Sequence, residues 1–302
     1  MRIIKSTFVM TMLTIAMTAL FGCVSVDANG RDFFSGRESI KPSGKIVSKT
    51  FKVAPVNSIS VTSIVDVVVT QGNTQKIVVK GSDNLIPYCE IKNNDGKLTV
   101  GMTKEARSKS FPKCDLIVYV TVKDINNVSS SGTGDVKFQG SVKSQILRLS
   151  VSGTGDVSVP VFNGDRLKVS ISGTGDVLIG GNVNNATLSV SGTGDINAKL
   201  SELTHLSASV SGTGDIELKG KTSSATYSVS GTGEIYARKM IARNVEATAS
   251  GTGDITCYAS DSFTGRRSGI ADITCYGKPK NRNLKTKGYS FCLLYTSPSP
   301  RD

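Results

Sequence analysis

Tryptophan is absent from this chain of 302 residues, and histidine occurs once, as His205. A lone imidazole cannot supply the ligand cluster of a histidine-based metal site, and it has no second histidine to work with in catalysis. Hydrophobic residues make up 38% and aromatic residues 6%, while glycine occurs 31 times. Because glycine is a poor helix former, this composition argues against a helix-rich fold as well as against imidazole chemistry.

The N-terminus indicates export. Two basic residues precede an apolar run from Phe8 to Phe21, which is too short for a membrane-spanning helix. The run ends in Leu20-Phe21-Gly22-Cys23, which resembles the lipobox of bacterial lipoproteins. We predict a signal peptide over residues 1–22, lipidation of Cys23 and a tether over residues 23–45. Ordinary signal cleavage a few residues later, which would discard Cys23, is the alternative.

The C-terminal residues 292–302 differ in composition from everything before them. Their sequence, Cys-Leu-Leu-Tyr-Thr-Ser-Pro-Ser-Pro-Arg-Asp, resembles the conceptual translation of a transposase sequencing adapter. We therefore predict that this segment is an artefact tail, with a genuine Pro-containing tail as the alternative.

The formal net charge is +12, yet no run of basic residues is longer than Arg266-Arg267. Such an excess favours anionic partners, such as acidic polysaccharide or lipid headgroups. We expect envelope or host polysaccharide and, through a lipid anchor, the membrane as partners. We expect no nucleic-acid partner for an exported chain, and the sequence does not indicate an oligomeric state.

An internal repeat of about 20 residues occupies the second half of the chain. Its signature is Ser-Gly-Thr-Gly followed by Asp or Glu, and the last copy is degenerate. The copies begin at Ser131, Ser152, Ser172, Ser191, Ser211, Ser230, Ser250 and Ser268. This regular spacing predicts an architecture built from stacked repeats.

Alternation typical of β-strands flanks each copy. Leu167, Val169 and Ile171 alternate with polar residues before one copy, and Val177 and Ile179 follow it. Each unit thus has about five small or branched side chains to bury, too few to fold alone, so the units must stack and share a core. An extended unit is roughly 66 Å long, enough for one closed coil, and eight coils at about 4.8 Å make a column roughly 38 Å tall.

We therefore predict an all-β fold: a single-stranded parallel β-helix, or β-solenoid, over residues 128–291. An antiparallel sandwich also uses strands at this spacing, and it is the alternative. The sandwich does not require identical turns on every unit, whereas stacked coils do.

Each copy of the repeat predicts a corner between two strands, in which the glycines, the threonine and the acidic residue have separate roles. The glycines allow backbone angles that other residues rarely adopt, and they let stacked corners approach closely. The threonines predict an outward column that includes Thr154, Thr174, Thr193 and Thr213. The acidic residues predict a second column, formed by Asp135, Asp156, Asp176, Asp195, Asp215, Glu234, Asp254 and Asp272.

Something must offset the repulsion within the acidic column, because carboxylates about 5 Å apart repel by roughly 0.8 kcal/mol in water. Turn N–H groups that donate to each carboxylate are one interpretation. A bound cation such as Ca²⁺, as in nonapeptide toxin repeats, is another, and recognition of a repeating ligand such as a glycan is the third. Because the period is about 20 rather than nine and the other ligands of that repeat are missing, we expect no metal and no cofactor.

Residues 46–127 predict a hairpin-rich β region that caps one end of the solenoid, since an open coil end would expose strand edges. Residues 64–80 predict one hairpin. Residues 88–100, centred on Asn93 to Gly96, predict a second, and residues 116–122 predict a further buried strand.

Besides Cys23 and a cysteine in the predicted tail, four cysteines remain. Cys257 and Cys275 occupy matching inward positions in adjacent coils, where a strained disulfide and a pair of buried thiols are both feasible. Cys89 and Cys114 are the other possible bridge. No cysteine spacing resembles a zinc site.

The β-rich lead-in with Ser82 to Tyr88, followed by repeated Ser-Gly-Thr-Gly-Asp turns on an exported chain, carries a family resemblance. It resembles the bacterial family called "putative auto-transporter adhesin, head GIN domain" over about residues 46–290. The resemblance implies an outer-membrane lipoprotein of a Bacteroidota envelope, facing the periplasm or the cell surface.

Two functional classes follow. The first, which we favour, is a non-catalytic binding scaffold or adhesin, with glycans as ligands. The second is a polysaccharide lyase or hydrolase, since β-helices host both. A hydrolase needs two carboxylates at a defined separation in one cleft, whereas the acids here repeat uniformly, so we predict no catalytic residues. Ice binding by the threonines is disfavoured because one row is not a flat two-row array.

Overall fold

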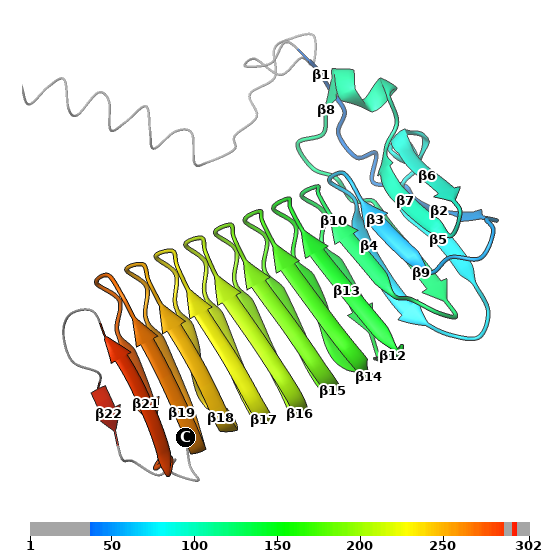
Figure 1. Ribbon diagram of the computed structural model, residues 1–302. Helices are drawn as coiled ribbons and strands as arrows, with labels where there is room; N and C mark the ends of the chain where they lie inside the picture. Colours follow the sequence, from blue (N-terminus) through cyan, green and yellow to red (C-terminus); the bar gives the residue numbers. More distant parts are fainter. Residues whose placement is uncertain (1–36, 287–291, 295–302) are drawn as a thin grey trace, which may run out of the picture.

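The computed structural model describes residues 37–286 and the backbone of residues 292–294. The predicted signal peptide, Cys23, the first part of the tether and most of the predicted tail lie outside the described residues. The described strands stack side by side into an elongated column, and their connecting turns line up along one edge (Figure 1). None of the helices within these residues is long and apolar enough to cross a membrane.

Six long strands form the repetitive part of the column. They are β14 (Val157–Ile171), β15 (Val177–Val190), β16 (Ile196–Val210), β17 (Ile216–Val229), β18 (Ile235–Ala249) and β19 (Ile255–Arg267). Each strand curves round the column from one Ser-Gly-Thr-Gly turn to the next. Neighbours pair in parallel and in register, so that Leu167 lies beside Ala186, which lies beside Leu206. The predicted β-solenoid is confirmed, and the antiparallel sandwich is wrong for these coils.

Shorter strands continue the column at both ends. Before β14 lie β10 (Asn127–Ser130), β11 (Val136–Gln139), β12 (Ser141–Lys143) and β13 (Ile146–Val151). After β19, the strands β20 (Ile273–Tyr276) and β21 (Asn281–Thr286) pair with it in parallel, and β22 (Cys292–Leu294) pairs with β20. The backbone of β22 therefore joins the sheet, although it begins at the first residue of the predicted tail.

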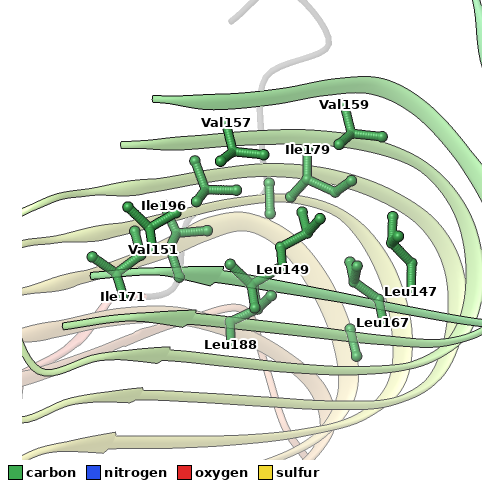
Figure 2. Packing of buried hydrophobic residues seen from close by; sticks show 14 of the residues in the cluster. Leu147, Leu149, Val151, Val157, Val159, Leu167, Ile171, Ile179, Leu188 and Ile196 are labelled. Atoms are coloured by element: carbon green, nitrogen blue, oxygen red, sulfur yellow. The ribbon is translucent and has the colours of Figure 1, made fainter. Parts of the chain in front are cut away.

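The interior of the column is one continuous hydrophobic core. Leu167, Val169 and Ile171 are buried, whereas Lys168 between them is exposed. Side chains of successive coils stack over one another, as Val151 and Ile171 do in Figure 2. Each such side chain stabilises the fold by about 1.5–3 kcal/mol, but a single coil has few of them. Stability therefore depends on contacts between neighbouring coils.

Differences in repeat length are absorbed away from the turns. The register of β14 and β15 shifts between Val159 and Phe162, and similar shifts occur between β15 and β16 and between β16 and β17. A bulge accommodates an extra residue locally and leaves the rest of the pairing intact. The turn residues of all the coils consequently stay aligned, although the repeat spacing varies.

Tyr227 is the largest fully buried side chain and depends on small neighbours for its space. It lies between Ala208 and Ala247 of the adjacent coils. Its hydroxyl has no hydrogen-bond partner among the described residues. Burial raises the pKa of this phenol well above its ordinary value. The ring stabilises the core, but the hydroxyl group costs free energy.

We expect Tyr227→Phe to raise the free energy of unfolding by about 1 kcal/mol, because an unpaired buried hydroxyl loses its water without gaining a partner. Urea unfolding followed by circular dichroism measures the change. A loss of stability would contradict the interpretation that the hydroxyl group is buried without a hydrogen-bond partner.

Residues 46–127 extend the column as well as capping it. The strands β3 (Ser58–Val61) and β4 (Asp66–Gln71) pair in parallel with β10 and β11. On their other side lie β7 (Lys97–Met102) and β9 (Ile117–Val122), again in parallel. The order of coils in space therefore differs from their order in the chain, because residues 97–122 lie outside residues 58–71.

The hairpin predicted over residues 64–80 is wrong, and the one predicted over residues 88–100 is confirmed. β5 (Lys76–Ser82) does not pair with β4, because β9 lies between the two strands. β6 (Cys89–Asn94) and β7 form an antiparallel pair. Asp95 and Gly96, both with positive φ, complete the two-residue turn that favours such a hairpin.

Antiparallel strands close the N-terminal end of the column. β5 pairs antiparallel with β9, and β2 (Ile46–Phe51) adds to β5 in the same sense. The chain between β7 and β9 leaves the column through the short helix η2 (Glu105–Ser108) and β8 (Lys109–Ser110), which pairs with β1 (Glu38–Ser39); η1 (Ile86–Tyr88) precedes β6. These elements cover edges that a bare coil would leave open.

Candidate functional site

The Ser-Gly-Thr-Gly turns stack so closely that only glycine fits. A Cβ atom on Gly192 would lie 2.0 Å from the carbonyl oxygen of Gly173, and one on Gly194 would lie 2.2 Å from that of Gly175. The predicted need for unusual backbone angles is wrong for the first seven copies, because among the glycines of these turns only Gly269, in the degenerate copy, has a positive φ. Close approach of neighbouring backbones is the reason for these glycines.

An earlier turn, which the sequence analysis missed, begins the series between β3 and β4. Here Ser63 and Val65 occupy the places of the two glycines, against Gly132 and Gly134 of the next coil. Their side chains fit because the chain between β7 and β9 leaves the column, so that no turn lies on that side. Asp66 takes the place of the acidic residue, directly before a run of valines.

The acidic column is a hydrogen-bonded ladder. In seven of the coils the backbone N–H of the acidic residue donates to Oδ1 of the aspartate in the preceding coil; the step from Asp254 to Glu234 is the exception among the described residues. The N···O distances are 2.9 Å (Asp135 to Asp66), 3.1 Å (Asp156 to Asp135), 2.9 Å (Asp176 to Asp156), 2.8 Å (Asp195 to Asp176), 2.7 Å (Asp215 to Asp195), 2.7 Å (Glu234 to Asp215) and 2.6 Å (Asp272 to Asp254). These N–H donors, together with water at the exposed side, offset the repulsion between carboxylates.

The ladder changes at Glu234, whose side chain is one methylene longer than that of Asp. The Glu234 carboxylate accepts a hydrogen bond from the Tyr236 hydroxyl, and this bond, with burial and nearby acids, raises the pKa of Tyr236 to about 12. Tyr236 therefore remains a protonated donor at any physiological pH.

Asp176→Ala removes the acceptor of the Asp195 N–H, and we expect it to lower the free energy of unfolding by about 1 kcal/mol. Asp176→Asn keeps Oδ1 and removes one charge from the column, so we expect its stability to equal or exceed that of the wild type. Parallel urea titrations of the two variants measure the difference. Equal losses in both variants would contradict the role of the hydrogen bond.

The predicted threonines form the crest of the turns. Thr154, Thr174, Thr193 and Thr213 are all exposed, one per coil. Isoleucines replace threonine at both ends of this crest: Ile64 in the first turn and Ile270 in the last, where the side chain is 78% exposed. The crest therefore combines small polar side chains along its length with an apolar residue at each end.

A shallow hollow of about 420 Å³ lies beside the ladder, on the strands that follow the turns. Asp195, Ile196, Asn197, Asp215, Glu217 and Tyr236 line it. The Glu217 carboxylate accepts a hydrogen bond from Asn197 Nδ2 at 2.8 Å and pairs with Lys219 Nζ at 2.6 Å. The hollow therefore presents fixed carboxylates, an amide and a 42%-exposed tyrosine ring together.

Sequence reasoning identified only the two aspartates of this hollow. Asn197, Glu217 and Tyr236 each stand two positions after an acidic residue, in a column where other coils carry residues such as Ser158 and Leu178. Their departure from the consensus of the repeat was the signal that could have found them. The consensus of the repeat indicates only the residues that all the coils share.

Metal-ligating clusters of three or more His, Cys, Asp or Glu side chains are absent from the described part of the chain. His205 lies away from the ladder, with Nδ1 2.6 Å from Ser224 Oγ. The carboxylates of the ladder other than those of Glu234 and Asp272 already accept a backbone N–H, and their second oxygens can accept hydrogen bonds from polar groups.

Free thiols are present at Cys89, Cys114, Cys257 and Cys275. Cys257 and Cys275 lie side by side on β19 and β20, both buried, and their mutual hydrogen bond and burial raise the pKa of Cys257. Burial and the neighbouring Cys114 raise the pKa of Cys89 to about 12. Neither possible bridge is formed in the structure, and the pair of buried thiols is the arrangement present at Cys257 and Cys275.

Solved structures share this fold. Over 85% of this chain and 100% of the other, a putative adhesin from Bacteroides fragilis NCTC 9343 is 24% identical with a TM-score of 0.55. A putative adhesin from Parabacteroides merdae ATCC 43184 is 21% identical over 85% and 99%, with a TM-score of 0.66. A structure from Parabacteroides distasonis ATCC 8503, described as a putative lipid binding protein, is 21% identical over 85% and 100%, with a TM-score of 0.61.

At these identities the similarity concerns the fold alone, and no curated protein matches the chain. The sequence profile of one family, however, matches residues 56–202 and 199–279, which together make up most of the described column. The chain belongs to the family described as "Putative auto-transporter adhesin, head GIN domain".

Proposed function

We propose that this protein is a non-catalytic adhesin of the bacterial envelope that binds glycans. We name its binding surface the post-turn face, defined as the outward side chains two and four positions after each acidic residue of the turns. The hollow lined by Asn197, Glu217 and Tyr236 on this face is the observation that carries the proposal.

The hollow offers the chemistry that sugars require. Carboxylate oxygens accept hydrogen bonds from sugar hydroxyl groups, and a side-chain amide both donates and accepts them. An exposed tyrosine ring can cover the apolar face of a sugar. Rigid placement of these groups on stacked strands keeps the entropy cost of binding low. The adhesin description of the family supports the same conclusion.

The polar contacts argue against the enzyme alternative. Hydrolysis requires one carboxylic acid and one free carboxylate on either side of the scissile bond. Asp195 Oδ1 accepts the Asp215 N–H, and Glu217 is already held by Asn197 and Lys219. Because these carboxylates are held within the fold, they fit the role of fixed binding groups.

A glycan array with the purified full chain tests the proposal. We expect dose-dependent retention of a subset of glycans, with the chain length of each glycan unchanged after incubation. The variant Glu217→Gln/Tyr236→Ala should lose about tenfold in affinity, while Leu178→Ala, in the same column of the face, should bind like the wild type. Shortened oligosaccharides would establish an enzyme, and equal binding by the hollow variant would exclude the hollow as the site.

Export and lipid anchoring complete the proposal, and both depend on the N-terminal sequence. A fatty acid on Cys23 would hold the column at the outer membrane, with residues 23–45 as the tether. Expression of Cys23→Ser in a bacterial host tests the anchor. We expect the wild type in the membrane fraction and the variant in the soluble exported fraction; equal partition of the two would contradict lipidation.

A further inference from the structure

A row of lysines lies next to the hollow. Lys199 and Lys219 stand four positions after an acidic residue, on the post-turn face, and Lys239 stands five positions after Glu234 because the register shifts there. Lys199 lies opposite Lys219 of the next strand, and Lys219 lies opposite Lys239 of the strand after it. Like charges directly opposite each other on neighbouring strands destabilise a sheet. Within the part of the chain that the structure describes, Lys219 has an ion pair, with Glu217, whereas Lys199 and Lys239 are exposed cations without one. We name these three residues the lysine strip.

Aromatic rings and further cations continue the strip toward the C-terminal coils. The guanidinium of Arg238, which neighbours Lys239, lies over the ring of Tyr276 at 4.6 Å from its centre. Tyr276 in turn lies beside Tyr258 of the preceding coil, and both side chains are partly exposed. Two exposed lysines, Lys278 and Lys280, follow on the same chain. The face thus combines basic groups with adjacent tyrosines.

We propose that the lysine strip, with Arg238 and the two tyrosines, binds a linear acidic polysaccharide that runs along the axis of the column. Successive coils are about 4.8 Å apart, so a chain lying along the axis meets one cation per coil. Uronate carboxylates would pair with the ammonium groups, and Tyr258 and Tyr276 would contact the sugar rings. The inference rests on the proposed glycan-binding function and adds the charge class of the ligand.

The surroundings favour a polysaccharide over a membrane surface. A basic surface that binds lipid usually inserts apolar side chains beside its cations. The large exposed aliphatic side chains of the described residues are Ile46, Ile64, Val161, Leu178, Ile270 and Leu284, and none of them belongs to the strip. Tyr258 and Tyr276, which lie beyond the strip, are partly covered by their neighbours, which suits flat contact with a sugar ring.

The test compares two variants of the full chain that remove the same charge from different faces. The strip variant is Lys199→Gln/Arg238→Gln/Lys239→Gln. The control is Lys143→Gln/Arg148→Gln/Lys168→Gln, in which Arg148 and Lys168 are also stacked and exposed but lie on strands that precede the turns. Equal melting temperatures of the two variants and the wild type establish that the comparison concerns binding.

Immobilised polygalacturonate is the acidic probe, and dextran of similar length is the neutral one. We expect the wild type to bind polygalacturonate with an affinity that falls as salt rises, the strip variant to lose at least about tenfold, and the control to lose less than about twofold. Equal losses in the two variants would overturn the proposal, because they would show that net charge alone determines binding.

Two further probes separate other sources of negative charge. Tighter binding to vesicles of phosphatidylglycerol and phosphatidylcholine, or to duplex DNA, than to polygalacturonate would overturn the choice of polysaccharide. Binding of neutral glycans through the hollow without binding of polygalacturonate would refute this inference while leaving the proposed adhesin function intact. Absence of binding to every glycan would refute both.

Discussion

Gly192→Ala is expected to lower the free energy of unfolding by at least about 3 kcal/mol, the upper end of the usual cost of overpacking a core. The new Cβ would lie 2.0 Å from the carbonyl oxygen of Gly173 and 2.7 Å from the carbonyl carbon of Ser172. Both atoms belong to the backbone of the preceding coil, so no side-chain rotation can relieve the contact. The coils must separate locally, which breaks hydrogen bonds between them.

Thr193→Ala is the matched control, since it alters the neighbouring residue at the exposed crest of the same turn. Its effect should stay within about 0.5 kcal/mol. Urea unfolding of the two variants and the wild type, followed by circular dichroism, gives the comparison. If both substitutions had the same small effect, close approach of the turns could not be the reason for the glycines.

Phe162→Ala is expected to destabilise the protein by about 3–5 kcal/mol. The ring is fully buried where the register of β14 and β15 shifts, and it lies beside Gly181 of the next coil. Removing it leaves a cavity between coils, which the stiff stacked backbones cannot close. The effect should therefore reach the neighbouring coils.

Val161→Ala provides the comparison for this site, because Val161 is adjacent in the chain and 40% exposed. We expect a change below about 1 kcal/mol for it. Hydrogen exchange of the two variants measures how far the damage extends: Phe162→Ala should weaken protection in β14 and β15 together. Loss of protection in β14 alone would contradict a core that is shared between coils.

The repeated part of the fold could be predicted because its signals are local and recur in every unit. The alternation around Ile171 and Val177 predicts strands, and the identical turns predict their parallel stacking. The N-terminal region lacks such repetition. Its alternation correctly identified β4, β5, β7 and β9 but not β2. The pairing of β4 with β9 instead of β5 depends on contacts between distant residues, which periodicity does not reveal.

The candidate site was predictable only in part, for a related reason. An acidic residue follows the turn in every coil, so the acidic column could be found from spacing alone. Asn197, Glu217 and Tyr236 each occur once, and their proximity depends on strands separated by whole coils. The partners of the carboxylates are backbone N–H groups of the following coil, and spacing in the sequence does not indicate which backbone group a side chain contacts.

Both binding proposals require that each column of side chains run straight along the axis with one residue per coil. Spin labels at Thr133 and, in separate variants, at Thr213, Thr232 or Thr252 test this arrangement by dipolar distance measurement. Separations of four, five and six coils predict distances near about 19, 24 and 29 Å, rising by about 4.8 Å per coil. Distances that fail to increase with the number of coils would contradict the stacked column.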